Sequence, residues 1–412
     1  MKVVQVNGGD KGGGATNASY RLHHEYLRRG EDSYICAAKT SEPEERIAEL
    51  PKHSLMERIS RRYWARQGLN YVEIRSSYRL QEHEYFRGKP ILHFHNIHGG
   101  YFNYEALPKL TANEPAVWTL HDMWSFTGHC VYSLDCNRWK SGCGKCPYPG
   151  EYPAIKYDAT DRELRLKQKV YQNSNLLITS PSQWLADLAR TSILKHFDVR
   201  TVPNGIDLKV FKPLEKAEIR RELGIQDGRV VLLWGTHQLT DLRKGGDVIV
   251  ELAKSLPAEF RKRITLLAFG SGTEELAKQL PELDVRPFGF VKTDQQMATV
   301  LNAADLLLFP SRADNLPFTI MEALGCGLPT IAFNVGGVPE MVRQELTGLL
   351  VSPFDVSEFV HKVIQLSNLP DTLRKMSAAC RTVAENEYGI ELMADRYLSI
   401  YDEIRRTSAV AA

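Results

Sequence analysis

Short apolar runs alternate with helical spacings of apolar residues along the chain. In the first half, the runs that predict buried strands are residues 2–6, 33–37, 90–95, 116–120 and 176–179. Helical patterns cover residues 16–29 and 183–192. In the second half, residues 230–234 and 304–309 predict strands, and residues 266–272 and 285–291 predict strand-to-loop turns. Alternation of this kind predicts an α/β fold with parallel, doubly wound sheets.

The stretch 309–329 combines a strand end, a polar loop and a helix. The helix signals are Asp314 or Asn315 as N-cap, Pro317 in the first turn, and Gly325 and Gly327 at the end. A helix N-terminus after a strand is an anion site, because backbone N–H groups and the helix dipole both point at the ligand. The stretch therefore predicts a phosphate site.

Glu322 lies one turn beyond Phe318 on the same face of that helix. Its carboxylate can accept hydrogen bonds from the hydroxyls of a sugar attached to the phosphate. The alternative is an ordinary strand, loop and helix in which Asp314 caps the helix and Glu322 is solvated.

Length and charge narrow the class of protein. The 412 residues, of which 43% are apolar, are enough for two or three domains. A net charge of +2 gives no basic excess for nucleic acid, which we exclude as a partner. No window of about twenty apolar residues predicts a membrane span. The N-terminus enters a strand without a signal-peptide pattern, so we expect a cytoplasmic protein, free or attached to the inner face of the membrane.

Residues 52–89 carry nine Lys or Arg and four Glu, interleaved with aromatic residues. Such a segment favours either a solvated helical face with aromatic rings packed beneath it or peripheral contact with an anionic membrane.

The first strand leads into a glycine-rich loop, residues 7–15. A nicotinamide fingerprint is incomplete, because Asn17 stands where its third glycine is needed. Gly13 and Gly14 allow a ligand to approach the backbone, and the following helix N-terminus can face a phosphate. The alternative is a tight turn without a ligand.

Histidines gather at two strand ends of the first half. His93, His95 and His98 follow one predicted strand, and His121 with Asp122 follows the next. Three imidazoles are compatible with a metal, but a strand end at a ligand cleft explains them equally well. His121 and Asp122 are the candidate active-site pair of the first domain.

Four cysteines lie within seventeen residues, at positions Cys130, Cys136, Cys143 and Cys146. Four thiolates can close one tetrahedral site, which predicts a structural zinc ion without an open position for chemistry. The alternatives are reduced thiols or disulfides.

Residues 201–213 have the turn and proline signals of a linker. Beyond it, Lys244-Gly245 follows a predicted strand, and Arg243 is the nearest second cation. Fixed cations at this place would stabilise the charge that grows on a departing diphosphate. The alternative for Lys244 is a surface lysine at a helix start.

Together, these motifs resemble those of retaining nucleotide-sugar glycosyltransferases of family 4, and in particular the bacterial exopolysaccharide and lipopolysaccharide enzymes. The motifs in family order are the first glycine loop, His121-Asp122, the linker Pro-Asn-Gly-Ile-Asp-x-x-x-Phe-x-Pro, Lys244-Gly245, Asp314-(seven residues)-Glu322, and Gly336-Gly337. The resemblance implies the GT-B architecture, two facing Rossmann-like domains with parallel sheets. We expect an acceptor-side domain at residues 1–205 with a C-terminal helix at about 386–412, and a nucleotide-sugar-binding domain at residues 206–385.

The resemblance also implies roles for individual residues. The catalytic group would be His121, Asp122, Lys244 and Asp314. The donor would be bound by Gly13, Gly14, Arg243, Lys244, Gly270, Phe288, Asn315, Leu316, Pro317, Phe318 and Glu322. This sequence departs from the family at two places, with Asp314 where Glu is usual and Thr236 where Arg is usual.

The implied reaction moves a sugar, with retention of anomeric configuration, from a nucleotide-sugar donor to a glycan or lipid-linked glycan acceptor. No Asp-x-Asp motif is present, so no metal cofactor is expected for catalysis. Two alternatives stay open, a nucleotide-sugar 2-epimerase on the same two-domain frame and a catalytically weak scaffold that binds nucleotide sugars.

Overall fold

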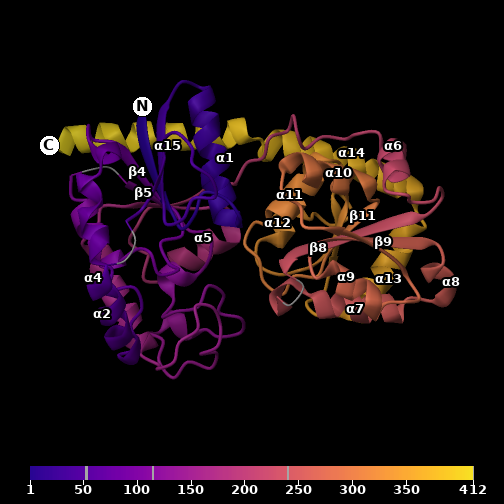
Figure 1. Ribbon diagram of the computed structural model, residues 1–412, viewed down its shortest axis with the longest axis horizontal. Coiled ribbons are helices and arrows are strands. Elements are labelled where there is room, and N and C mark those ends of the chain that lie inside the picture. The colour runs from indigo at the N-terminus through magenta and orange to yellow at the C-terminus, as the bar shows by residue number, and fades with distance from the viewer. Residues whose placement is uncertain (52–53, 114–115, 239–240, 412) are drawn as a thin grey trace. The chain divides into compact units, whose positions relative to one another are not determined.

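The computed structural model describes residues 1–51, 54–113, 116–238 and 241–411. The chain forms two compact units, coloured in sequence order in Figure 1. Unit 1 comprises Met1–Gly205 and Ile390–Ala412, and unit 2 comprises Ile206–Gly389. Among the described residues, no helix is long and apolar enough to cross a membrane.

The described part of unit 1 contains a seven-stranded parallel sheet with the order β3-β2-β1-β4-β5-β6-β7. The strands are β1 (Lys2–Asn7), β2 (Asp32–Ala37), β3 (Ile47–Glu49), β4 (Ile91–Phe94), β5 (Ala116–Thr119), β6 (Leu177–Ser180) and β7 (Val199–Thr201). The five strands predicted from the sequence are present, while β3 and β7 are short additions at the two edges. The order reverses direction at β1 and β4, where such sheets bind ligands beyond the strand ends.

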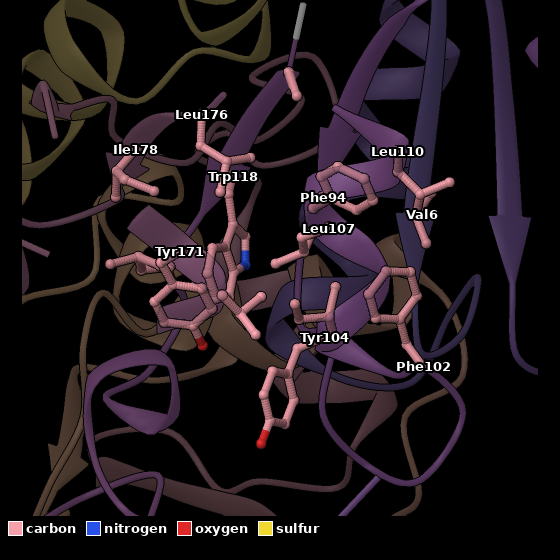
Figure 2. Close-up of a cluster of buried hydrophobic side chains, with 14 of the residues drawn as sticks. Val6, Phe94, Phe102, Tyr104, Leu107, Leu110, Trp118, Tyr171, Leu176 and Ile178 are labelled. Carbon is pink, nitrogen blue, oxygen red and sulfur yellow. The ribbon is translucent and has the colours of Figure 1, made fainter. Parts of the chain in front are cut away.

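The helices of unit 1 are α1 (Gly14–Arg28), α2 (Leu55–Arg66), α3 (Leu107–Leu110), α4 (Thr160–Gln172), α5 (Gln183–Arg190) and α15 (Ile390–Ala411). Short 3₁₀ turns are η1 (Arg75–Glu82), η2 (Glu84–Phe86), η3 (Tyr104–Ala106), η4 (Trp124–Phe126) and η5 (Arg138–Lys140). Figure 2 shows the main core, in which Phe94 and Trp118 of neighbouring strands lie among Phe102, Tyr104 and Tyr171. All five side chains are buried, as expected beneath a parallel sheet covered by helices.

The described part of unit 2 contains a six-stranded parallel sheet with the order β10-β9-β8-β11-β12-β13. The strands are β8 (Val230–Gln238), β9 (Ile264–Ser271), β10 (Asp284–Gly289), β11 (Leu306–Phe309), β12 (Thr330–Phe333) and β13 (Gly348–Val351). The helices are α6 (Lys216–Glu222), α7 (Gly246–Ser255), α8 (Ala258–Arg261), α9 (Thr273–Gln279), α10 (Asp294–Ala303), α11 (Phe318–Gly325), α12 (Val338–Met341), α13 (Val356–Ser367) and α14 (Pro370–Glu387), with the 3₁₀ turn η6 (Leu242–Lys244). The strand order reverses at β8 and β11, and the stretch 309–329 follows β11.

Helix α15 is fixed to the sheet of unit 1 by buried hydroxyl groups. The Tyr401 hydroxyl lies 2.6 Å from His93 Nδ1, and the Tyr397 hydroxyl lies 2.9 Å from Thr119 Oγ1. Both tyrosines are fully buried. The last segment of the chain therefore completes the fold of the first.

We predict that Tyr401→Phe lowers the free energy of unfolding of unit 1 by about 1–3 kcal/mol, because His93 Nδ1 then loses a buried hydrogen bond. Urea unfolding followed by tryptophan fluorescence measures this, since five of the six tryptophans lie in residues 1–205. Tyr63→Phe, at an exposed ring, is the control and should change nothing. Equal stability of Tyr401→Phe and wild type would contradict this account of α15.

Candidate active site

The loop after β11 places Asp314 against two cations of unit 2. Asp314 Oδ2 lies 2.6 Å from Lys244 Nζ and 3.5 Å from an Arg243 guanidinium nitrogen, and it accepts a 3.1 Å hydrogen bond from Ser311 Oγ. Burial opposes ionisation of Asp314, but the charges of Lys244 and Arg243 outweigh it and hold the pKa of this carboxyl below its usual value. Asp314 is therefore a buried carboxylate held in an ionic cluster.

The two cations come from the turn η6, which is tied to the Asp314 loop. Arg243 donates from its guanidinium to Ala313 O at 2.9 Å, and its own carbonyl accepts from Arg312 N at 2.7 Å. Asp241 caps the start of this turn, because its carboxylate accepts a 3.1 Å hydrogen bond from Arg243 N. These bonds hold Lys244 and Arg243 against the loop that leads into α11.

Two glycines allow neighbouring loops to approach the Asp314 loop closely. Gly245 has a φ of +74°, and a Cβ there would lie 2.2 Å from Pro310 O. Gly336 has a φ of +56°, and a Cβ there would lie 2.0 Å from Asp314 O. Neither position has space for a side chain, so Gly245 and Gly336 have a physical explanation.

Helix α11 begins at Phe318, and its N-cap residue is Pro317, which makes no side-chain cap. The N-cap is therefore neither Asp314 nor Asn315, the two residues that the sequence predicted for this position. For Asp314 the reason is that its carboxylate is bonded to Lys244 and Ser311. The helix ends at Gly325, and Gly327 is left-handed at φ +71°, as the sequence predicted.

The remaining donor-site candidates of unit 2 lie in three places. Glu322 is buried within α11, with 5% of its surface exposed. The buried residues at the start of α11 and just before it are Asn315, Leu316, Pro317 and Phe318. Gly270 is the last residue but one of β9, with a φ of +113° and packed against Thr236 O, and Phe288 is half-buried on β10.

In unit 1, Asp122 is engaged through both carboxylate oxygens. His98 Nε2 donates to Oδ2 at 2.8 Å, and Trp124 N donates to Oδ1 at 2.9 Å. Burial opposes ionisation of Asp122, but His98 and the backbone hydrogen bond outweigh it, so its pKa is lowered. Asp122 thus orders the loop beside His121.

His121 is linked through His95 to the interior of the sheet. His95 Nδ1 lies 3.0 Å from His121 Nε2, and His95 Nε2 lies 3.0 Å from Gln5 Oε1. His93 makes separate contacts with Thr119 and Tyr401. Hydrogen bonds to protein atoms thus account for the polar edges of His93 and His95.

The first glycine loop leads into α1. Gly13 is the N-cap of this helix, its backbone is extended, and no side chain caps the first turn. Both Gly13 and Gly14 are exposed. Asn17, which stands where a nicotinamide fingerprint would need its third glycine, accepts a 3.3 Å hydrogen bond from Gly12 N through Oδ1. Its side chain therefore has a structural role in the loop.

The four cysteines line one small pocket together with His129. Within the described ranges, no group of three or more His, Cys, Asp or Glu side chains is arranged to hold a metal ion, so structural zinc is not supported. All four cysteines are free. His129 Nδ1 donates to Pro153 O, so its Nε2 accepts from the Cys146 thiol at 3.2 Å.

Burial also favours neutral thiols in this cluster. It raises the pKa of Cys130 to about 12 and that of Cys143 to about 11. Reduced thiols, one of the alternatives that the sequence left open, describe the cluster in this structure.

Two residues of these clusters were absent from the sequence prediction. Ser311 contacts Asp314 from three residues earlier, and Gln5 contacts His95 across 90 residues. His98 was named among the strand-end histidines, but its pairing with Asp122 across 24 residues was not predicted. Of the two absent residues, only Gln5 carried a signal, as a polar residue inside an apolar strand run.

Comparisons with known proteins agree with this geometry. Residues 12–210 match the model of Glycosyltransferase Family 4, and residues 228–368 match that of Glycosyl transferases group 1. The chain is 29% identical to the colanic acid biosynthesis glycosyl transferase WcaC of Escherichia coli (strain K12), with 98% of this chain and 100% of the relative covered.

Solved structures also resemble the chain over nearly its whole length. Sucrose-phosphate synthase from Thermosynechococcus elongatus matches with a TM-score of 0.74 at 19% identity, covering 99% of this chain and 100% of that one. HepE of Anabaena, in complex with UDP-glucose, matches with a TM-score of 0.66 at 16% identity, covering 98% and 100%. These likenesses confirm the predicted GT-B fold. The chain therefore belongs to glycosyltransferase family 4, group 1, and is a glycosyltransferase.

Proposed function

We propose that this enzyme transfers a sugar, with retention of configuration, from a nucleoside-diphosphate sugar to a glycan or lipid-linked glycan in surface polysaccharide synthesis. The observation that carries the proposal is the cluster of Lys244, Arg243 and Asp314 at the N-terminal end of α11. Full-length similarity to WcaC supports the polysaccharide pathway, and the UDP-glucose complex of HepE supports the donor class.

The donor diphosphate is assigned to the start of α11. Backbone N–H groups and the helix dipole favour an anion there, and the N-cap residue, Pro317, has no polar side chain of its own. Lys244 and Arg243 add two positive charges, which stabilise the diphosphate as the glycosidic bond breaks. Because fixed cations supply this charge, the proposed reaction needs no metal cofactor.

Asp314 keeps Lys244 in place in this scheme. Aspartate is one methylene shorter than the glutamate usual in the family, and its Oδ2 already contacts Lys244 and Ser311. Glu322, buried in the same helix, is assigned to hydroxyl groups of the donor. His121, oriented beside Asp122, is assigned to the reacting sugars from unit 1.

Lys244→Ala should lower kcat by about 100- to 1,000-fold, the usual loss when one stabilising group for transition-state charge is removed. Initial rates of transfer to a lipid-linked glycan, with and without EDTA, measure this. Lys254→Ala, at an exposed lysine on α7, is the matched control. Unchanged kcat in Lys244→Ala would refute the role of this ammonium, and conversion of donor without any acceptor would favour the epimerase.

Glu322→Gln should weaken donor binding about tenfold or more, because hydrogen bonds to a charged group contribute about 1.5–3 kcal/mol. Ligand-detected NMR against UDP-, GDP- and ADP-sugars gives the dissociation constants. Glu251→Gln, at an exposed carboxylate on α7, should bind like wild type. Equal affinity of Glu322→Gln and wild type would remove Glu322 from the donor site.

Helix α2 supports peripheral membrane contact. At about 100° per residue, Leu55, Met56, Ile59 and Tyr63 fall within an arc of about 100°. These four side chains are 58–75% exposed, although apolar helix faces normally pack on a core. The single acidic residue of α2, Glu57, is buried and bonded to Ser54 N and to Ser76 N.

The charges around this arc match an anionic lipid surface. Arg58 and Arg62 are exposed along one border of the apolar arc, and Arg66 is exposed within it. Beside α2, a groove of about 350 Å³ is lined by Trp64 together with Arg162, Arg165 and Lys169, and by one carboxylate, that of Glu105. An apolar face bordered by arginine is typical of helices that lie in a membrane interface. We assign this face to the membrane that carries a lipid-linked acceptor.

Replacing Arg58, Arg62 and Arg66 by Gln should weaken binding to anionic vesicles about 100-fold, since each basic residue near such a surface contributes about 1 kcal/mol. Cosedimentation with phosphatidylethanolamine vesicles, with or without phosphatidylglycerol, measures the partition. Leu55→Ser with Ile59→Ser should also lose binding, whereas Leu369→Ser, exposed in unit 2, should not. Vesicle binding that is unchanged by both sets of substitutions on α2 would place the membrane contact elsewhere.

A further inference from the structure

Gln5 is a fully buried amide in the middle of β1 whose orientation is fixed by its partners. Its Nε2 lies 3.2 Å from Ser19 O, a carbonyl that can only accept. The amide nitrogen must therefore point at Ser19. Gln5 Oε1 then points at His95 Nε2, 3.0 Å away, and it can only accept as well.

These two contacts determine which nitrogen of His95 carries the proton. Because Gln5 Oε1 cannot donate, His95 Nε2 must do so. Burial, followed by the neighbouring rings of His93 and His121, lowers the pKa of His95 well below its ordinary value, so this ring is neutral and has one proton. His95 Nδ1 therefore carries a lone pair.

The proton position on His95 in turn determines the tautomer of His121. His121 is the partly exposed ring at the end of the contact series Gln5–His95–His121, which we call the relay. His121 Nε2 lies 3.0 Å from the lone pair of His95 Nδ1, so it is the donor in that contact. The two rings are stacked with centroids 5.3 Å apart, which keeps the contact aligned. Burial lowers the pKa of His121 to about 4, although Asp122 opposes that shift. A neutral His121 with its proton on Nε2 has its lone pair on Nδ1.

We propose that Gln5 and His95 are positioning residues that hold His121 in the neutral tautomer protonated at Nε2, so that His121 accepts a hydrogen bond through Nδ1. The proposal concerns the internal geometry of unit 1, and its catalytic meaning rests on the proposed function. A sugar hydroxyl is the chemical group that such a nitrogen recognises. His121 then orients a hydroxyl of the donor or acceptor sugar and does not act as a general acid.

The tautomer of His121 can be observed directly in the full-length protein. Long-range ¹H–¹⁵N spectra of histidine-labelled protein distinguish Nε2–H, Nδ1–H and doubly protonated rings, and His121→Gln assigns the signals by their loss. In the wild type, we expect the Nε2–H pattern for His121 at neutral pH. In Gln5→Met, His95 Nε2 loses its acceptor, so we expect a measurable share of His121 in the Nδ1–H form and about a tenfold loss of kcat/KM.

Tyr401→Phe is the matched control. It removes a hydrogen bond from His93, whose ring lies 4.1 Å from that of His95 in the same buried layer, but it leaves the Gln5–His95–His121 contacts intact. This variant should lose stability and keep the Nε2–H tautomer of His121.

An Nδ1–H or doubly protonated His121 in the wild type would overturn the proposal, even if Gln5→Met failed to fold. A folded Gln5→Met with an unchanged His121 tautomer would overturn it too. The spectra require no substrate. If the protein transferred no sugar but showed the expected tautomers, the proposed function would be refuted and the proposed tautomer of His121 would still hold.

Discussion

Parallel strands covered by helices on both faces can present side chains to a ligand in the loops beyond the carboxyl ends of the strands. Both units have this arrangement. In unit 1, His95 and His121 follow β4 and β5, and in unit 2 the Asp314 loop follows β11. The candidate chemistry is therefore set by strand order, which reverses beside each of these loops.

Within this frame, the two clusters use opposite electrostatics. In unit 2, Asp314 is ionised because Lys244 and Arg243 compensate its burial. In unit 1, burial and the neighbouring rings both lower the pKa of His95, and burial outweighs the opposing effect of Asp122 on the pKa of His121, so both rings are neutral. A charged cluster suits a diphosphate, whereas neutral hydrogen-bonding rings suit hydroxyl groups. The distribution of charge between the units thus agrees with a donor held by one and an uncharged reacting group met by the other.

The sequence was sufficient for the fold class, because long alternating patterns of strand and helix survive small errors at their ends. It missed β3 and β7, since three residues are too few to show a period, and it also missed the four-residue strands β12 and β13. It assigned Asp314 to a helix cap because local rules see only neighbours, while Lys244 is 70 residues away. The pair of His98 and Asp122 and the contact of Gln5 with His95 are equally non-local.

The cysteine cluster shows a different limit of sequence reasoning. Spacing places four thiols near one another, and the structure does gather them around one pocket. Spacing does not determine the directions of the sulfur atoms or the burial that favours neutral thiols. In the described chain, the thiol of Cys146 donates to His129 instead.

The most direct test of the central claim is a crystal structure of the full chain with the nucleoside diphosphate that binds most tightly. Our account predicts the diphosphate at the N-terminal end of α11, within hydrogen-bonding distance of Lys244 Nζ. A diphosphate bound at the start of α1, with the end of α11 unoccupied, would contradict the assignment of the donor site to unit 2.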